Sequence, residues 1–291
     1  MPEAKPVRGI EVVHVLPVLR ARIAEWKRAG ERIALVPTMG NLHAGHFSLI
    51  ERARMQADRV VASVFVNPTQ FGPDEDFARY PRTPDDDVRG LDAAGCDLVW
   101  APDIATMYPA GVEAAVRMNV PAVGDDLEGV SRPGHFDGVA TVVSRLFLQV
   151  QPDVAVFGRK DYQQLAVIRR LVDDLAFPVA IVAGETRREA TGLAMSSRNQ
   201  YLTAAEHEHA ALLYRALQEV STTVGRGGEV DAAVREATNA LTAAGFKVDY
   251  VAVRRADLQP VAPTDRDLVV LVAARLGRTR LIDNLEFRRG P

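Results

Sequence analysis

The sequence is poor in cysteine and contains no long apolar run. Its one cysteine, Cys96, has no partner in the chain for a disulfide, which indicates a reducing environment. The longest apolar stretches, such as residues 60–66, are far shorter than the roughly 20 residues that cross a bilayer. Residues 1–6 lack the apolar core of a secretory signal peptide. These absences predict a cytoplasmic protein with no membrane partner.

An excess of one charge is also missing. The chain has 35 basic and 38 acidic residues and a net charge of -3, which gives no broad footprint for nucleic acid. With 291 residues, of which 47% are hydrophobic and 25% are charged, it has the composition of an ordinary globular protein. This length suits about two domains, and the composition excludes disorder.

Two familiar nucleotide motifs are absent as well. The chain contains neither the Gly-x-x-x-x-Gly-Lys-Ser/Thr of P-loop proteins nor the Gly-x-Gly-x-x-Gly dinucleotide fingerprint. Any nucleotide must therefore be held in another way.

Apolar patterning predicts an α/β fold in the first part of the chain. Short apolar strands alternate there with amphipathic helices, which is typical of a Rossmann-like, doubly wound parallel sheet. The strands are expected at 33–36, 60–66, 97–100, 153–157 and 179–183, and the helices at about 16–29, 46–57, 84–94, 139–150 and 162–175. Ligands of such sheets bind at the carboxyl ends of the strands. We assign residues 1–185 to this domain, which we expect to hold the ligand at the carboxyl ends of its strands.

Beyond this domain the pattern changes. Helices are expected at 204–224 and 230–244, followed by strands at 248–253 and 268–274. Residues 186–291 are therefore predicted to form a smaller α+β domain that acts as a lid.

The first strand is followed by His43-Ala44-Gly45-His46 at the start of a helix. A glycine there lets a ligand approach the backbone, and a helix N-terminus attracts phosphate. Two imidazoles would complete an anion site. The alternative is a turn glycine beside two partly exposed histidines. A zinc site is less favoured, because no cysteine or carboxylate lies nearby in the sequence.

Polar residues also follow two later strands. Asn67 and Gln70 come after the second strand, where their amides suit a small polar acid, although an Asn-Pro turn explains them as well. Lys160 and Gln164 follow residues 153–157 at the mouth of a helix. A lysine there suits phosphate, and the alternative is a solvated surface lysine.

Three further segments are less specific by themselves. Ser196, Ser197 and Arg198 supply hydroxyl donors and a guanidinium for phosphate. The cluster Arg132, His135 and Phe136 is expected either to form a wall of the site or to be a capped loop. Residues 85–87 are three aspartates at a helix start, where the helix dipole favours them, and this does not exclude a metal.

Taken together, His43-Ala44-Gly45-His46 and Met195-Ser196-Ser197-Arg198 resemble the signatures of the nucleotidyltransferase superfamily that includes class I aminoacyl-tRNA synthetases. The whole chain more closely resembles the pantothenate synthetase (pantoate–β-alanine ligase) family. The segments that carry this resemblance are 37–43, 65–68, 80–83, 133–136, 160–164 and 281–284.

The resemblance implies an AMP-forming ligase, EC 6.3.2.1. It would join pantoate to β-alanine with ATP and Mg²⁺ through a pantoyl adenylate, releasing AMP and pyrophosphate. His43, His46, Lys160 and Arg198 would be catalytic. The implied ATP-binding set is Met39, Gly40, Asn41, Leu42, His43, Ala44, Gly45, His46, Gly158, Arg159, Lys160, Asp161, Arg187, Met195, Ser196, Ser197 and Arg198.

The resemblance also makes residues 1–185 the nucleotide- and pantoate-binding domain and assigns the other ligands. Gln70 and Gln164 would bind pantoate, and Gln70 would also lie beside β-alanine. Asp86 and Asp87 are the candidates for a metal. The family resemblance further implies a homodimer formed through the first domain.

This sequence departs from the family pattern at several positions. Arg159 stands where glutamate is usual, and Arg187 where an apolar residue is usual. Thr69 and Thr191 replace an expected methionine and aspartate. Arg159 and Arg187 keep open a catalytically silent nucleotide-binding regulator of the same fold. An aminoacyl-tRNA synthetase fragment is disfavoured, because no tRNA-binding surface is evident.

Overall fold

The computed structural model describes residues 9–73 and 75–290, which form two compact units. The opening residues, on which the prediction about a signal peptide rests, lie outside the described residues. The first unit comprises residues 1–118, 137–157 and 172–184, and the second comprises 119–136, 158–171 and 185–291. The predicted domains meet at 185/186, next to the change of unit between Gly184 and Glu185; two shorter segments, 119–136 and 158–171, also group with the second unit.

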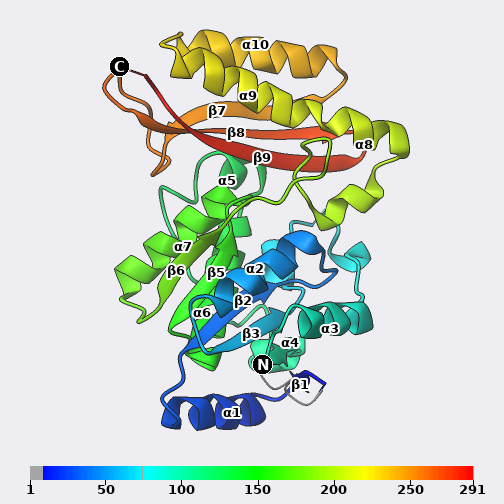
Figure 1. Cartoon of the computed structure of the whole chain (residues 1–291), viewed down its shortest axis with the longest axis vertical. Helices are drawn as coiled ribbons and strands as arrows, with labels where there is room; N and C mark the ends of the chain where they lie inside the picture. The colour runs from blue at the N-terminus through cyan, green and yellow to red at the C-terminus, as the bar shows by residue number, and fades with distance from the viewer. Residues whose placement is uncertain (1–8, 74, 291) are drawn as a thin grey trace, which may run out of the picture. The chain divides into compact units, whose positions relative to one another are not determined.

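The elements of the chain are labelled in Figure 1. The strands are β1 (Glu11–Val13), β2 (Ile33–Thr38), β3 (Arg59–Val64), β4 (Leu98–Trp100), β5 (Val154–Gly158), β6 (Ala180–Gly184), β7 (Lys247–Arg255), β8 (Asp267–Leu276) and β9 (Thr279–Arg288). The α-helices are α1 (Leu16–Arg28), α2 (Ala44–Arg54), α3 (Pro84–Ala93), α4 (Ile104–Met107), α5 (Glu128–Ser131), α6 (His135–Val150), α7 (Tyr162–Leu175), α8 (Ala204–Ala210), α9 (Leu212–Gly225) and α10 (Val230–Ala243). Three 3-10 turns, η1 (Pro68–Gln70), η2 (Phe77–Arg79) and η3 (Ser197–Tyr201), complete the elements.

The first unit is built on a six-stranded sheet with the order β1-β4-β3-β2-β5-β6. The pairs β1–β4, β4–β3, β3–β2 and β2–β5 are parallel, so the predicted parallel sheet is confirmed. The chain winds from β2 through β3 to β4 on one side, and β5 lies on the other side of β2. Strand β2 therefore lies at the topological switch point, where ligands of such sheets bind.

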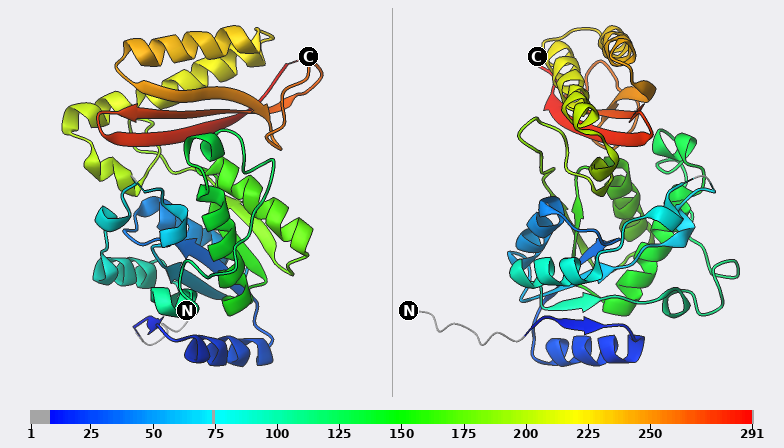
Figure 2. Two further views of the ribbon diagram at one scale, coloured as in Figure 1. Left: turned by 180° about the vertical axis from the view of Figure 1, so that it is seen from behind. Right: turned by 90° about the vertical axis from the view of Figure 1, so that its right-hand side faces the viewer.

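Helices cover this sheet on both faces, as the side view in Figure 2 shows for α2 and α6. Ala34 and Val36 of β2 belong to the cluster formed with Leu49 and Ile50 of α2. Leu35 is fully buried but lies outside that cluster, as expected for a strand whose alternate side chains point to opposite faces. Burial of both faces explains why the parallel strands are continuous apolar runs.

The second unit contains the antiparallel sheet β7-β8-β9. Helices α9 and α10 cover one face through an apolar cluster that includes Leu217, Leu241 and Val270. Leu127 and Tyr162 cover the other face. The predicted helix over 204–224 is broken at Ala211 into α8 and α9, and β1 and β9 were not predicted.

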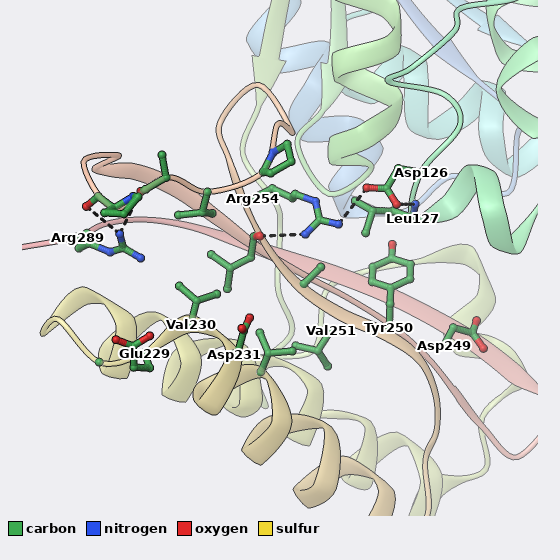
Figure 3. A pocket seen from close by; sticks show the side chains of 18 of the residues that line it. Asp126, Leu127, Glu229, Val230, Asp231, Asp249, Tyr250, Val251, Arg254 and Arg289 are labelled. Carbon is green, nitrogen blue, oxygen red and sulfur yellow. Dashed lines mark hydrogen bonds and ion pairs between the residues drawn. The ribbon is translucent and has the colours of Figure 1, made fainter.

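A cavity of about 800 Å³ lies along β7 in the second unit. As Figure 3 shows, Arg254 at its edge pairs with Asp126 at 3.0 Å, and Arg289 donates to loop carbonyls. None of the candidate site residues lines this cavity. Within the described residues, no helix is long and apolar enough to cross a membrane.

Candidate active site

The turn between β2 and α2 is built around two residues with left-handed backbone. Gly40 has φ of +84° and Asn41 has φ of +51°. A side chain at Gly40 would meet an oxygen of Asp87 at 3.0 Å, so glycine suits both the backbone conformation and the space. The Gly40 N–H donates to Thr38 Oγ1, and that hydroxyl donates to the Ser63 carbonyl. This turn aims the following histidines at the start of α2.

His43 and His46 form a reciprocal cap at the N-terminus of α2. His43 Nδ1 accepts the Gly45 N–H at 3.1 Å, and His46 Nδ1 accepts the His43 N–H at 3.3 Å. The ring centroids lie 4.2 Å apart. With Nδ1 as acceptor, each neutral ring carries its proton on Nε2, which makes Nε2 a donor suited to a phosphate oxygen. The Gly45 N–H, which lies at this helix N-terminus, is used in the cap.

Asp87 at the start of α3 stabilises the same turn through hydrogen bonds to its backbone. Its carboxylate accepts the N–H groups of Asn41 at 2.9 Å and Leu42 at 2.8 Å, and the Thr83 hydroxyl at 3.1 Å. The residue is 2% exposed. Asp87 therefore fixes the backbone that leads into His43. The sequence suggested only a helix-dipole or metal role for it.

Gln70 is placed by a network of buried amides. Asn67 Nδ2 donates to Gln70 Oε1 at 3.0 Å and to the Gly138 carbonyl at 3.1 Å. Gly138 permits this approach, because a Cβ there would lie 2.3 Å from the Thr69 carbonyl oxygen. The Tyr108 hydroxyl donates to Asn67 Oδ1 at 2.6 Å. Asn67 thus orients Gln70, beyond forming a simple Asn-Pro turn.

In the second unit, the loop from β5 to α7 carries Lys160. The Asn284 amide of β9 donates to the Arg159 carbonyl at 3.1 Å and to the Lys160 carbonyl at 2.7 Å. The Lys160 ammonium lies 3.9 Å from the Asp161 carboxylate, and its side chain is 19% exposed. This placement differs from that of a freely solvated surface lysine.

Arg159 forms ion pairs in the second unit. Its Nη1 lies 2.8 Å from Glu286 and 3.3 Å from Glu185. Glu286 also accepts the Tyr162 hydroxyl at 3.0 Å. Burial, together with the charge of Glu286, raises the pKa of Tyr162. The positive charge introduced at position 159 is thereby compensated by nearby carboxylates.

Residues 187–195 form a short hairpin that leads into the serine segment. Arg188 and Ala194 form an antiparallel bridge, and the Met195 N–H donates to the Arg187 carbonyl. The Arg187 side chain is exposed, so the contact of this position with the hairpin is made by its backbone. Arg188 is clamped by Asp283 through two hydrogen bonds, at 2.6 and 3.0 Å.

Ser196, Ser197 and Arg198 follow this hairpin directly. The Ser196 hydroxyl caps η3 by accepting the Arg198 N–H at 3.2 Å. Asn199 is buried next to them and donates to Glu189 and to the Ala194 carbonyl. The segment is thus held by its own turn and by the hairpin before it.

The two adjacent glutamines of α7 differ in their surroundings. Gln163 is 3% exposed and bonds to the backbone of Val123, Asp126 and Glu128. Gln164 is half-buried, and among the described residues its amide makes no hydrogen bond. Gln163 is therefore structural, whereas the polar groups of Gln164 are not used in hydrogen bonds within the described residues.

The segment before α6 is anchored by a buried ion pair. Glu128 and Arg280 share two hydrogen bonds of 2.7 Å, and Tyr250 donates to Glu128 at 2.9 Å. Burial by itself would raise the pKa of Glu128, but the hydrogen bonds and charge of Arg280 outweigh it, so the pKa is lowered. Farther along, Arg132 bonds to His135 at 3.0 Å, and the His135 ring lies against Phe136.

The described residues contain no cluster of three or more histidine, cysteine or acidic side chains able to hold a metal. Asp86 is exposed and pairs with Arg89, while both Asp87 oxygens accept protein hydrogen bonds. These two aspartates do not fit a metal site. Burial raises the pKa of Cys96 to about 12, which makes it a structural thiol.

The candidate residues fall into two groups. The first unit brings together Met39, the His43–His46 cap and Gln70, whose amide lies 3.2 Å from the Met39 sulfur. The second unit contains Gly158–Asp161, Gln164, Arg187 and Met195–Arg198. Sequence reasoning missed Asp283 and Asn284 as supports of this second group. Their signal was that segment 281–284 carries part of the family resemblance, which by itself assigned them no role.

Comparisons with known proteins show the family to which the chain belongs. The profile of the pantoate-beta-alanine ligase family matches residues 11–286. The chain belongs to that family. Pantothenate synthetase of Xanthomonas campestris pv. campestris (strain B100) is 59% identical over 286 residues, covering 96% of this chain and 100% of the relative. That of Xylella fastidiosa (strain 9a5c) is 60% identical over 280 residues, with the same coverage.

Solved structures of the family have the same fold. The pantothenate synthetase of Thermus thermophilus superposes with a TM-score of 0.89 at 48% identity, covering 95% of this chain and 99% of that one. The pantoate-beta-alanine ligase of Francisella tularensis, solved with beta-gamma ATP and beta-alanine, gives a TM-score of 0.81 at 32% identity, covering 95% and 97%. The family assignment made from the sequence is confirmed.

Proposed function

We propose that this chain joins pantoate to β-alanine at the expense of ATP, forming pantothenate, AMP and pyrophosphate. The observation that carries the proposal is the family match over residues 11–286. The relative from Francisella tularensis, solved with beta-gamma ATP and beta-alanine, supports ATP and β-alanine as substrates. The His43–His46 cap supports an anionic, phosphate-bearing ligand.

The reaction proceeds in two steps. An oxygen of the pantoate carboxylate bonds to the α-phosphorus of ATP, and the bond from that phosphorus to the β-phosphate oxygen breaks, releasing pyrophosphate. The β-alanine amine then attacks the acyl carbon of the adenylate. A C–N bond forms, the C–O bond to AMP breaks, and the amine loses a proton to solvent. Catalysis of the first step rests on positioning and charge neutralisation.

The proposed roles follow from the chemistry of the side chains. His43 and His46 donate from Nε2 to the triphosphate, with His46 as the proton donor. Lys160 and Arg198, with the hydroxyls of Ser196 and Ser197, hold the β- and γ-phosphates and stabilise the departing pyrophosphate. Electrostatic contacts of this kind are worth roughly 3–4 kcal/mol each in the transition state. A Lys160→Ala variant is therefore expected to lose on the order of 100-fold in adenylation rate, and a near-normal rate would contradict its role.

The remaining residues bind the organic parts of the substrates. Gln70 and Gln164 bind pantoate, because amides pair with hydroxyl and carboxylate groups together. Gln70 also lies beside β-alanine. Backbone and side chains at Met39–Leu42, Gly158 and Arg187 surround the nucleotide, and Asp161 binds the ribose.

We propose that ATP enters as its magnesium complex. Mg²⁺ in such enzymes is commonly held through substrate phosphates and water with few protein ligands. This agrees with the engagement of Asp86 and Asp87 in protein contacts.

We further propose a homodimer through the first unit. Val116 and Leu148 are 72% and 57% exposed there, and Arg145 of α6 donates to the Val116 carbonyl, which places both segments together. Sedimentation at equilibrium tests this, since a monomer at micromolar concentration would contradict it. Cytoplasmic location stays a prediction from the sequence.

Product analysis tests the function directly. The protein is mixed with ATP, Mg²⁺, pantoate and β-alanine, each is omitted in turn, and products are identified by mass spectrometry. Pantothenate with AMP is expected only in the complete mixture. AMP and pyrophosphate without pantothenate would refute β-alanine as acceptor. ATP binding without turnover would instead indicate the silent regulator.

A further inference from the structure

Strand β9 contains two adjacent polar residues that are nearly fully buried. Asp283 and Asn284 are each 5% exposed and pair across the sheet with Val272 and Leu271 of β8. Apolar residues would fill these positions at lower cost, because burying a carboxylate or an amide is unfavourable unless every polar group is satisfied. The contacts of the two side chains explain why they are polar.

Asn284 reaches the loop between β5 and α7. Its amide nitrogen donates to two consecutive carbonyls, that of Arg159 at 3.1 Å and that of Lys160 at 2.7 Å. Both N–H bonds of the amide are thereby used on one peptide segment. The backbone that carries Lys160 is thus fixed to β9.

Asp283 contacts the hairpin of residues 187–195 through Arg188. Its two oxygens accept from Arg188 at 2.6 and 3.0 Å, and one of them accepts the Asn284 N–H at 2.8 Å. Arg188 also donates to the Gly192 carbonyl at 3.1 Å, and its guanidinium lies 3.7 Å from the centroid of the Tyr214 ring. The hairpin that leads into Ser196 is thereby held by the residue next to Asn284.

We propose that Asp283 and Asn284 are positioning residues that hold the Lys160 loop and the Ser196–Arg198 segment in a fixed spacing for pyrophosphate release. The proposal rests on the function proposed above for those phosphate-binding residues. The Cα atoms of the consecutive residues Asp283 and Asn284 are about 3.8 Å apart. Both segments are therefore attached to the same short stretch of strand β9. Burial raises the pKa of Asp283, although its hydrogen bonds to Arg188 act in the opposite direction.

Misplacement of a catalytic group by about 1 Å can cost on the order of 100-fold in rate. The test uses Asn284→Ala and the isosteric Asn284→Asp, which cannot donate to the two carbonyls. Pantoate-dependent exchange of pyrophosphate into ATP isolates the adenylation step. We expect its kcat to fall roughly 10- to 100-fold in both variants. Single-turnover transfer from preformed adenylate to β-alanine should change less than about threefold, because AMP, not pyrophosphate, leaves in that step.

A matched control separates positioning from stability. Gln149 accepts the Trp100 indole N–H at 3.0 Å in the first unit, so Gln149→Ala also removes a buried hydrogen bond. This variant should lower the melting temperature and leave the exchange kcat per folded molecule unchanged. Asp283→Asn should slow pyrophosphate exchange about as much as Asn284→Ala. In the Arg198→Ala background it should slow exchange little further, because the segment that it positions has lost its charged group.

A double-mutant cycle decides whether Asn284 acts through the Lys160 loop. In the Lys160→Ala background, Asn284→Ala should slow exchange less than about threefold further, because the group it positions is gone. Fully multiplicative effects would overturn the proposal. So would normal exchange in folded Asn284→Ala or Asn284→Asp while Lys160→Ala is impaired. Normal exchange in Lys160→Ala would instead refute the proposed role of Lys160, and the positioning role with it.

Discussion

Arg159 shows how one residue that departs from a family pattern is accommodated. The resemblance places glutamate at this position, yet the arginine lies 2.8 Å from Glu286 and 3.3 Å from Glu185. Its charge is compensated within the second unit by these two carboxylates. This removes the main reason for a silent regulator that the sequence raised.

Replacing Arg159 by glutamate should destabilise this protein, although glutamate is the family's usual residue. The change removes two partly exposed ion pairs, worth about 1 kcal/mol together, and places a third carboxylate near Glu185 and Glu286. We expect calorimetry to show a melting temperature lower by about 2–4 °C. Arg159→Ala should lose less, and adding Glu286→Arg should recover part of the loss. An unchanged melting temperature would show that these pairs contribute nothing.

At the scale of elements, the β2–α2 turn depends on a different helix. Asp87 of α3 accepts the N–H groups of Asn41 and Leu42, which precede the capped His43. The catalytic turn is therefore positioned by packing between segments that are more than 40 residues apart.

Asp87→Ala should impair both stability and use of ATP. Two partly buried N–H groups lose their acceptor, each at a cost of about 1 kcal/mol. Displacement of the histidines should lower kcat/KM for ATP by roughly 10- to 100-fold. Asp85→Ala, on the exposed face of the same helix start, is the control: it should cost less than about 1 kcal/mol, from the helix dipole, and leave kcat/KM for ATP unchanged.

Titration with Mg²⁺ distinguishes this role from metal binding. If Asp87 only positions the turn, raising Mg²⁺ should not restore the activity of Asp87→Ala. Recovery of the activity of Asp87→Ala at high Mg²⁺ would indicate that Asp87 is a metal ligand.

The elements of the fold that could be predicted are those with uniform patterning. Helix α7 begins and ends where predicted, at Tyr162 and Leu175, because its apolar face is continuous. Strand β9 was missed because Asp283 and Asn284 interrupt its apolar residues. The candidate residues at strand ends could be identified from their position and the family resemblance. Their supports could not, because Asn284 and Lys160 are 124 residues apart in the chain.

At the scale of the whole molecule, stability in acid depends on buried carboxylates. Glu128 joins segment 119–136 to the antiparallel sheet through Arg280, and Arg280 also bonds to Asp249 at 2.7 Å. Because the folded pKa of Glu128 is lowered, its ionisation stabilises the fold above the unfolded pKa of about 4.3. This contribution is lost as the pH falls through the lower, folded pKa.

Glu128→Gln should therefore be costly at neutral pH and nearly harmless in acid. Removing one partner of a buried ion pair costs about 3–5 kcal/mol, and we expect the lower end because Arg280 keeps Asp249. Urea unfolding from pH 7 to pH 3 should show the wild-type free energy approaching that of the variant below pH 4. Tyr250→Phe, which removes only one hydrogen bond to Glu128, should cost about 1 kcal/mol with the same pH trend. A gap between wild type and Glu128→Gln that stayed constant down to pH 3 would mean that the carboxylate charge is not what stabilises this segment.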